Sequence, residues 1–408
     1  MSSKPRVLMI ITLDTKQAEA GFVRQCLEQS GVQVIHLDAS IRHTVDGGAE
    51  IGPEQVAGAA GKSIEEVRAI GHEGKCQAVM TEGAIKLANQ IHESEGLSGV
   101  IAVGGSMGTT LATAVMRALP FGLPKVMVST MASGMTRGFV GSKDIVMVNS
   151  VADIAGLNTV TRSVFRNGAL AVAGMAKGYA PGKAETKPVV VMSTLGTTER
   201  CTRRIRTALE QRGFEVVVFH TTGAGGTAME EIVRERDVAV VLDLSLVEVV
   251  DLLNGGLCSA GPDRCKIELA KGIPVIFAPG NIDFIIAGPI DDAKARYPGK
   301  RYHVHNAALT AVRTEIPELN QIADHMAGLI RDAKGPVSFF VPLGGFSSHD
   351  STEGHLYDPS LPPVFAEHLK SVMPANTEVI TLPHHINDEP FADAIIERVV
   401  SYHEAAAG

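Results

Sequence analysis

Two stretches of the sequence decide the fold, because they repeat one pattern. Residues 6–35 read RVLMIITLDTKQAEAGFVRQCLEQSGVQVI, and residues 188–217 read PVVVMSTLGTTERCTRRIRTALEQRGFEVV. They align without a gap, since Thr15 matches Thr197 at an offset of 182 residues, 197 minus 15. Each contains an apolar strand, a turn with small hydroxyl side chains, an amphipathic helix that stops at a glycine, and a second apolar strand. This is the opening βαβ unit of a parallel sheet covered by helices.

The repeat predicts an α/β fold of two Rossmann-like domains, each a mostly parallel sheet covered by helices and related by internal duplication. LPKVMV at 123–128 also resembles IPVIFA at 273–278. We expect a first domain over residues 1–180 and a second over 188–408, with a linker, GYAPGKAETK, at 178–187 and a cleft between the domains. The length of 408 residues suits two domains of about 200 residues each.

Composition narrows the class of protein. Hydrophobic residues make up 45% and charged residues 20%, which is typical of a soluble globular protein, and the apolar runs are strand-sized, so we expect no membrane span and no signal peptide. A net charge of −8 argues against nucleic acid as the ligand. The five cysteines are odd in number and form no CxxC, which predicts reduced thiols and a cytoplasmic location.

The remaining apolar runs extend the same plan through both halves. In the first half we expect strands near 99–103, 126–129 and 145–149 and helices near 82–94, 109–118 and 153–172. In the second half we expect strands near 238–243, 275–278, 338–341 and 378–381 and a C-terminal helix near 391–406. Residues 38–61 are polar and rich in glycine, and a loop of that length is suited to covering a site.

The sharpest local signal is VGGSMGTT at 103–110. It follows a strand and opens a helix, so its N–H groups and the helix dipole favour an anion, while its glycines let the main chain approach a phosphate. It has neither the lysine of a P-loop nor the GxGxxG spacing. We therefore predict a phosphate or carboxylate ligand, with a merely tight turn as the alternative. The predicted ligand-binding residues of this turn are Gly104, Gly105, Ser106, Gly108, Thr109 and Thr110.

Two neighbouring turns are predicted to join this site. The carboxyl ends of parallel strands gather at one edge, where ligands bind. Lys16 can neutralise a phosphate, and Asp14 can hold a ribose hydroxyl or a metal, or simply cap its helix. The residues predicted from these turns are Asp14, Thr15 and Lys16 of the first, and Ser129, Thr130, Ser133 and Gly134 of the second. In the second half VLDLSLVE at 241–248 takes the place of the glycine turn, so the halves diverge where the phosphate is predicted to bind.

The second half is richer in groups that transfer protons. SSHD at 347–350 and HHIND at 384–388 each follow a predicted strand, and from them we predict a catalytic set of His349, Asp350, His384 and Asp388. The alternative is that these are surface or hydrogen-bonded loop residues. Arg313 and Asn306 are further candidates for anion binding. We assign no metal ligands, because no spacing typical of a zinc site occurs.

Six motifs together resemble an uncharacterised family that includes the N-terminal ATP-binding region of the tomato mosaic virus resistance protein. The resemblance covers essentially the whole chain and implies two Rossmann-like domains, ATP binding and a dimer. The antiviral role of the plant protein does not carry over to this chain. The motifs are TLDTK at 12–16, VGGSMGTT at 103–110, STMASG at 129–134, DIAGLN at 153–158, FVPLGGFSSHD at 340–350 and LPHHINDEPFA at 382–392.

Three functions fit these observations. The leading hypothesis is an ATP-binding protein, with or without Mg²⁺, that acts as a nucleotide-dependent enzyme on a small acidic metabolite in the interdomain cleft. The first alternative is a non-catalytic binding protein regulated by the nucleotide. The second is a metabolic enzyme that binds a carboxylate or sugar phosphate and no nucleotide. We expect a small-molecule ligand and a homodimer in each case.

Overall fold

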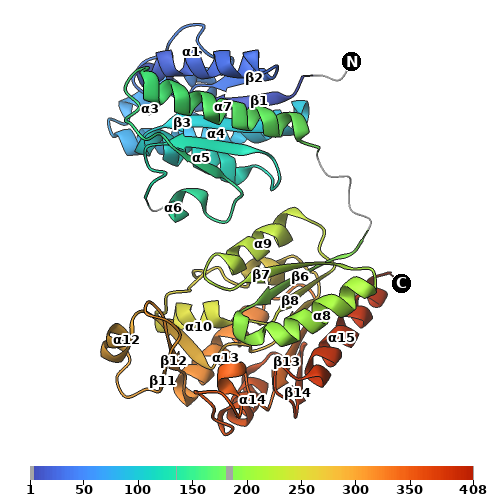
Figure 1. Ribbon diagram of the computed structural model, residues 1–408. Helices are drawn as coiled ribbons and strands as arrows, with labels where there is room; N and C mark the ends of the chain where they lie inside the picture. Colours follow the sequence, from blue (N-terminus) through green and yellow to red (C-terminus); the bar gives the residue numbers. More distant parts are fainter. Residues whose placement is uncertain (1–3, 135, 181–186, 408) are drawn as a thin grey trace. The chain divides into compact units, whose positions relative to one another are not determined.

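The computed structural model describes residues 4–134, 136–180 and 187–407 and divides into two compact units, Met1–Lys183 and Ala184–Gly408, here called unit 1 and unit 2 (Figure 1). Each unit has its own mostly parallel sheet covered by helices, which confirms the predicted two-domain α/β fold. Of the linker predicted at 178–187, residues 181–186 lie outside the described residues.

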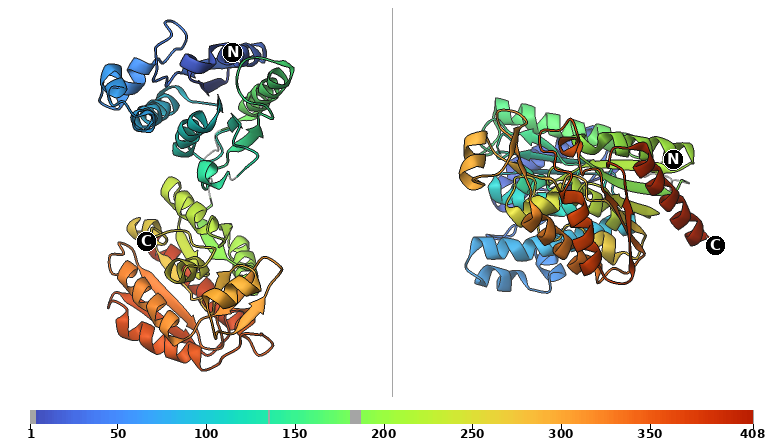
Figure 2. Two further views of the ribbon diagram at one scale, coloured as in Figure 1. Left: turned by 90° about the vertical axis from the view of Figure 1, so that its left-hand side faces the viewer. Right: turned by 90° about the horizontal axis from the view of Figure 1, so that it is seen from below.

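Unit 1 contains one sheet of five parallel strands in the order β2-β1-β3-β4-β5. Its helices lie on both sides of the strands (Figure 2). In chain order its elements are β1 (Arg6–Ile10), α1 (Leu13–Gln29), β2 (Gln33–Leu37), α2 (Pro53–Ala59), α3 (Ile64–Ala69), α4 (Glu73–Glu95), β3 (Gly99–Gly104), α5 (Ser106–Ala118), β4 (Lys125–Ser129), α6 (Arg137–Val140), β5 (Val146–Asn149) and α7 (Thr159–Gly178).

Both faces of the unit 1 sheet are buried, and successive residues of each strand divide between them. In β1, Leu8 and Ile10 pack in the core under α4 and α5, whereas Val7 and Met9 pack in the core under α1 and α7. A parallel strand covered on both sides is apolar at every position, which is why β1 reads as a continuous apolar run in the sequence.

Unit 2 contains a sheet of six parallel strands in the order β14-β13-β9-β8-β6-β7 and a separate antiparallel sheet in the order β10-β12-β11. Read from β7, the first five strands of this sheet follow the same order as the five strands of unit 1. The similar sequences at 123–128 and 273–278 lie at equivalent positions in the two sheets, where they form β4 and β9. The elements are β6 (Val189–Thr194), η1 (Gly196–Thr198), α8 (Glu199–Gln211), β7 (Glu215–His220), α9 (Gly225–Glu235), β8 (Val240–Asp243), α10 (Val247–Asn254), α11 (Lys266–Ala270), β9 (Val275–Phe277), β10 (Phe284–Ala287), α12 (Ile290–Arg296), β11 (Tyr302–Val304), β12 (Thr310–Arg313), α13 (Ile316–Ile330), β13 (Val337–Pro342), η2 (Ser348–Asp350), α14 (Leu361–Val372), β14 (Thr377–Leu382) and α15 (Glu389–Ala407).

Two helix starts differ from the sequence-based expectation by more than three residues, and side-chain caps explain both. The helix expected from 153 begins at Thr159, because the Asn158 side chain accepts hydrogen bonds from the N–H groups of Val160 and Thr161. The helix expected from 82 begins at Glu73, because the His72 imidazole accepts a hydrogen bond from Lys75 N. The antiparallel sheet between β9 and β13 was not predicted.

Helix α7 provides a matched test of this packing. A Cβ at Gly168 would lie 2.6 Å from Val128 Cγ2 on β4, whereas a Cβ at Gly174 has no atom within 4 Å. We predict that Gly168→Ala lowers the free energy of unfolding of unit 1 by about 1–3 kcal/mol through overpacking. Gly174→Ala should instead raise it by about 0.5–1 kcal/mol, because alanine is the better helix former. Urea unfolding measures both, and equal effects would contradict the placement of α7 on the sheet.

Candidate functional site

A cavity of about 290 Å³ lies in unit 1 at the carboxyl ends of β1 and β3. The strand order reverses between these two strands, and such a reversal is where parallel sheets bind ligands, because the turns on its two sides diverge. The cavity is lined by Ile10, Ile11, Thr12, Asp14, Thr15, Lys16, Ala39, Ile41, Arg42, Glu73, Gln77, Val103, Gly104, Gly105, Ser106, Met107, Gly108 and Leu111.

The glycine turn between β3 and α5 forms one wall. Gly105 is the N-cap residue of α5, so the N–H groups of the first helical turn face outward without a side-chain partner from the cap. The two adjacent glycines have different roles. A Cβ on Gly104 would lie 2.9 Å from Gly108 Cα, so Gly104 permits close packing of strand and helix, whereas a Cβ on Gly105 would meet nothing nearer than Thr130 Oγ1 at 3.9 Å. Gly105 therefore leaves space at the helix N-terminus.

The turn after β1 forms the opposite wall. Lys16 has φ −138° and ψ 37°, a non-helical conformation that kinks α1 where the cavity begins. Asp14 Oδ2 accepts hydrogen bonds from Ile41 N and Arg42 N, at 3.2 and 3.1 Å, and so fixes the segment after β2 against this turn. Asp14 thus has a structural role in addition to lining the cavity.

The cavity has a charged side and an apolar side. Lys16 and Arg42 bring positive charge, and the Arg42 guanidinium forms an ion pair of 3.2 Å with Glu73. Ile10, Ile11, Ala39, Ile41 and Leu111 contribute apolar side chains. Residues Ile41, Arg42, Glu73 and Gln77 were not predicted, although the polar excursion at 38–61 was expected to cover a site.

Seven of the predicted residues of unit 1 line the cavity: Asp14, Thr15, Lys16, Gly104, Gly105, Ser106 and Gly108. The others do not appear in its lining. Thr109 is buried and its Oγ1 lies 2.6 Å from Ser129 Oγ, so these two hydroxyls bond one another between the first turn of α5 and the end of β4. Thr110 donates to Ser106 O, and the turn residues Thr130, Ser133 and Gly134 follow β4 outside the cavity wall.

In unit 2 two of the predicted catalytic residues have structural partners. Asp350 is buried, its Oδ1 lies 3.1 Å from Arg313 Nη2, and its carboxylate accepts hydrogen bonds from Phe346 N and Asp358 N. Burial, reinforced by Asp283 and opposed by Arg313, raises the pKa of Asp350 to about 7. Asp388 Oδ2 accepts a hydrogen bond from His385 N at 2.8 Å, at the start of α15.

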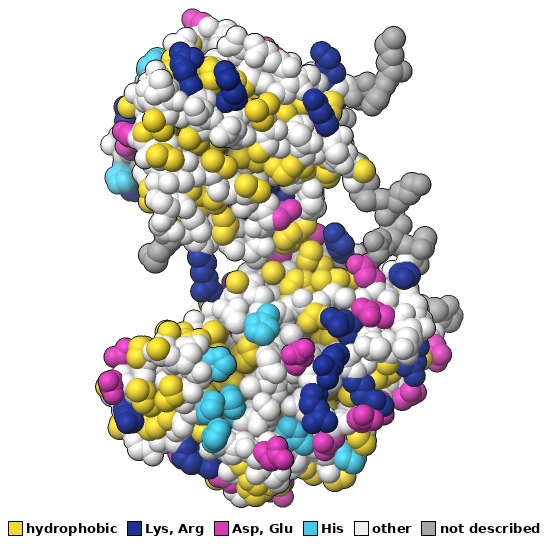
Figure 3. All heavy atoms as spheres, in the orientation of Figure 1, with side chains coloured by type: hydrophobic (Ala, Val, Ile, Leu, Met, Phe, Trp, Pro, Cys, Tyr) yellow, Lys and Arg dark blue, Asp and Glu magenta, His cyan; other side chains and the backbone are white. Residues whose placement is uncertain are grey.

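The two predicted histidines differ in their surroundings. His384 supplies its backbone carbonyl to Gly344 N, and it is the next residue, His385, whose Nε2 lies 2.9 Å from Ser347 O. His349 belongs to a group of histidines: its ring centroid lies 4.4 Å from that of His303, which stacks on His355 at 4.9 Å. Histidine side chains gather on the face of unit 2 seen in Figure 3.

Burial, reinforced by His303, His305 and His355, lowers the pKa of His349 to about 4. Its imidazole is therefore neutral at pH 7 and has a lone pair available to accept a proton.

The fold and the cavity together define a two-domain α/β protein with a cavity at the strand-order reversal of its first sheet. The chain belongs to the uncharacterised protein family UPF0261: the model of the N-terminal domain of that family matches residues 5–181, and the model of its C-terminal domain matches residues 187–403. This confirms the family resemblance inferred from the motifs.

Relatives of similar length come from bacteria. A UPF0261 protein of Clostridium tetani is 36% identical over 404 residues, covering 98% of this chain and 99% of that protein. The ToMV resistance protein Tm-1(GCR237) of Solanum lycopersicum is 31% identical and covers 97% of this chain, which spans only 55% of the plant protein. Among solved structures, a pyrethroid hydrolase matches with a TM-score of 0.28 and 12% identity over 55% of this chain and 99% of the hydrolase, a likeness too low to carry an argument.

Among the described residues, no helix is both long enough and apolar enough to cross a membrane.

The low pKa of His349 predicts how stability depends on pH. The unfolded chain protonates this histidine near pH 6.5, whereas the folded chain does so near pH 4, so the free energy of unfolding falls as the pH is lowered through that window. His349→Gln removes this contribution and should make the fall shallower. Urea unfolding at several pH values measures it, with His43→Gln, an exposed histidine of unit 1, as the control. If the free energy of unfolding of His349→Gln changed with pH as steeply as that of the wild type, the low pKa of His349 would be contradicted.

Proposed function

We propose that unit 1 binds ATP, with its phosphates on the glycine turn at 104–108. The observation that carries this proposal is the cavity at the strand-order reversal, which is lined both by Lys16 and by the start of α5, where the N-cap residue gives the N–H groups no side-chain partner. Backbone N–H groups at a helix N-terminus and a nearby cation are the standard elements of a phosphate site. The family resemblance implies the same ligand.

The distribution of side chains supports an orientation for the nucleotide. Phosphates suit the side with Lys16 and Arg42, and an aromatic base suits the apolar side around Ile10, Ala39 and Leu111. Cavities that bind small ligands start at about 300 Å³, so a volume of about 290 Å³ fits the smaller end of that class. Mg²⁺ would enter with the nucleotide, as it does at other sites where phosphates supply most of its ligands.

We further propose that the chain is a nucleotide-dependent enzyme acting on a small acidic metabolite, with His349 as its general base. The imidazole is neutral at pH 7, which is the form a general base requires, and its pKa of about 4 means that it holds an abstracted proton only weakly. We also propose that the protein is a homodimer and that it is located in the cytoplasm. The dimer is implied by the family resemblance, and the free state of all five cysteines supports a reducing compartment.

Substitution of Gly105 separates ligand binding from folding. The position has room for a side chain, and aspartate is a favourable N-cap residue, so Gly105→Asp should preserve stability. Its carboxylate would occupy the same N–H groups and repel a phosphate. We predict that Gly105→Asp binds ATP at least about 10-fold more weakly than Gly105→Asn, which has the same shape without the charge. Calorimetric titration with ATP, with and without Mg²⁺, measures the difference.

The controls distinguish the alternatives. If both variants bind ATP as tightly as the wild type, the turn is not the phosphate site. If the wild type binds inorganic phosphate or a sugar phosphate but no nucleotide, and Gly105→Asp loses that binding, the site holds a different anion and the ATP proposal is wrong. If ATP binds but is unchanged after incubation with candidate carboxylates, the protein is a nucleotide-regulated binder and the enzymatic part of the proposal is wrong.

A further inference from the structure

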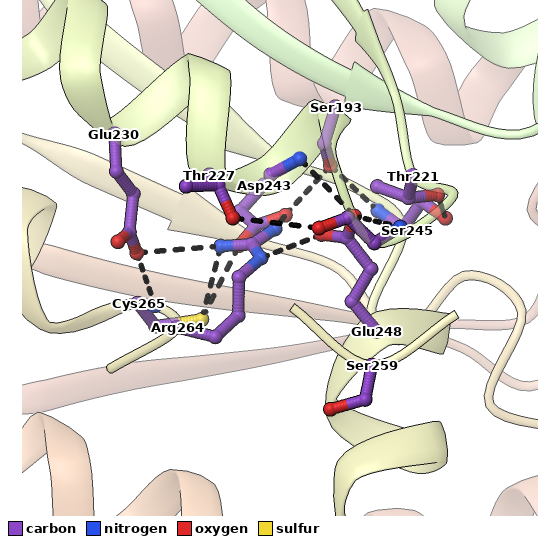
Figure 4. A network of polar contacts seen from close by, with 12 residues as sticks. Ser193, Thr221, Thr227, Glu230, Asp243, Ser245, Glu248, Ser259, Arg264 and Cys265 are labelled. Atoms are coloured by element: carbon purple, nitrogen blue, oxygen red, sulfur yellow. Dashed lines mark hydrogen bonds and ion pairs between the residues drawn. The ribbon is translucent and has the colours of Figure 1, made fainter. Parts of the chain in front are cut away.

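Unit 2 has a strand-order reversal at the same place as unit 1, between β6 and β8, but buried charged groups occupy it. Asp243 ends β8, and its Oδ1 accepts a hydrogen bond of 2.6 Å from Ser193 Oγ on β6. Figure 4 shows Arg264 among the carboxylates that meet there. The position that is an open cavity in unit 1 is therefore filled by an ion cluster in unit 2.

In this cluster the carboxylate of Glu248 takes the place that a bound phosphate would have. Glu248 Oε1 accepts hydrogen bonds from Gly223 N, in the turn after β7, and from Gly226 N, in the first turn of α9, at 2.7 and 3.1 Å. A Cβ on Gly226 would lie 1.9 Å from Glu248 Oε2, so this turn is built around the carboxylate. Because a side chain of the protein satisfies these N–H groups, unit 2 offers no equivalent phosphate site here.

Arg264 holds the cluster together but does not balance its charge. Its Nε lies 2.8 Å from Glu248 Oε2 and its Nη2 lies 2.9 Å from Asp243 Oδ1. Four carboxyl groups surround this one guanidinium, so the formal charge with every group ionised is −3, four minus one. The five side chains are Glu230, Asp243, Glu248, Glu268 and Arg264, and none is more than 4% exposed. Uncompensated charge at such depth is costly, so the cluster requires protons or a further cation.

The unbalanced charge is concentrated at Glu268. Among the described residues, no N–H or O–H group donates a hydrogen bond to Oε1 or Oε2 of this fully buried side chain. Arg264 Nη1 lies 3.9 Å from Oε1, and the Asp243 carboxyl lies close enough to share a proton with Glu268. Next to it, Cys265 Sγ lies 3.4 Å from Asp243 Oδ2. One ligand atom from each of these three side chains lies within 4.8 Å of the others. Cys265 has a φ of 72°, which is uncommon for a residue other than glycine.

We propose that Asp243, Cys265 and Glu268 bind one divalent transition-metal ion of the Zn²⁺ class. Thiolate and carboxylate oxygen are both ligands of Zn²⁺, and ions such as Mg²⁺ and Ca²⁺ disfavour sulfur. Arg264 keeps its contacts with Glu248 Oε2 and Asp243 Oδ1. Its Nη1 now lies 2.8 Å from Asp243 Oδ2 and 3.3 Å from Cys265 Sγ, and both of these contacts have to lengthen when the ion binds. The ion supplies the charge that the arginine does not.

The proposed ion is structural. All three ligands are buried, so a water molecule rather than a substrate fills the fourth tetrahedral position. It joins the end of β8 to the segment that leads into α11, two parts of unit 2 that are 22 residues apart in the sequence. Metal binding at such a place adds its binding free energy to the stability of the folded unit.

The physical alternative is a proton shared between Glu268 and Asp243, and Glu268→Gln distinguishes the two. Glutamine has the shape of a protonated glutamate and can donate to Asp243, so a shared proton predicts unchanged stability. A metal site predicts the loss of one ligand. The matched control is Cys201→Ser, since Cys201 is also a buried cysteine of unit 2 but lies outside the cluster.

The experiment uses the full chain after dialysis against a chelator, with Co²⁺ as a spectroscopic probe and Zn²⁺ as its competitor. We expect one ion per chain, an absorption band of a cobalt–thiolate bond and a rise in Tm on addition of Zn²⁺. Cys265→Ser should abolish the band, and Glu268→Gln should weaken Zn²⁺ binding at least about 10-fold. Cys201→Ser should behave as the wild type.

Two results would overturn the proposal. One is a wild-type chain that binds no Co²⁺ or Zn²⁺ and gains no thermal stability from either. The other is a cobalt band that persists in Cys265→Ser. The first result uses only the wild type, so a variant that fails to fold does not prevent the test. ATP binding by unit 1 is measured separately, so the two proposals can fail independently.

Discussion

Parallel pairing of strands through helical crossovers is the constraint on which both units depend. Because every strand of the main sheet runs in the same direction, each strand-to-helix turn comes to the carboxyl edge. The chain then places β2 on one side of β1 and β3 on the other, so the turns after β1 and β3 diverge. Unit 2 repeats this arrangement with β7, β6 and β8. In each unit, the residues after the first and third strands therefore decide what the edge can bind.

The two units place different charged groups at this edge. Unit 1 presents backbone N–H groups and a balanced set of charges, Lys16 and Arg42 with Asp14 and Glu73, whereas unit 2 presents an excess of buried carboxylates around Arg264. The strand register shows how they diverged. Ala102 pairs with Ile10 and Leu242 pairs with Met192, so Asp243 corresponds to Val103 and lies in the strand itself, one residue before the position of Gly104. The sequence comparison of VGGSMGTT with VLDLSLVE, in contrast, places Asp243 opposite a glycine. An acid within a buried strand requires a buried partner, and Arg264 is that partner.

The fold was largely predictable because its signals are local. The repeated βαβ pattern identifies β1, α1 and β2 and their counterparts β6, α8 and β7 without reference to distant residues. The glycine turn was predictable for the same reason, and with it most of one wall of the cavity. Thr109 and Ser129 are residue types that often bind phosphate, but in the structure their hydroxyl groups form a hydrogen bond with each other. A hydroxyl that can bind a ligand can equally bind a neighbour, and only the fold decides which.

The unpredicted parts share a different property: they are fixed by contacts between distant segments. Arg42 reaches the cavity because Asp14 holds its N–H group, across a polar loop without periodicity. Arg264 lies in a turn-rich stretch whose sequence indicates only a loop, yet it meets Asp243 and Glu248 in the interior.

These two arginines also show why one scaffold can support two kinds of site. At the open edge of unit 1, the exposed side chain of Arg42 can contact a ligand. At the filled edge of unit 2, the buried side chain of Arg264 is bound by the protein's own carboxylates. Both units keep the backbone arrangement that forms this edge of the sheet. The residues at the ends of β3 and β8 determine whether the edge is an open cavity, as in unit 1, or is filled by buried side chains, as in unit 2.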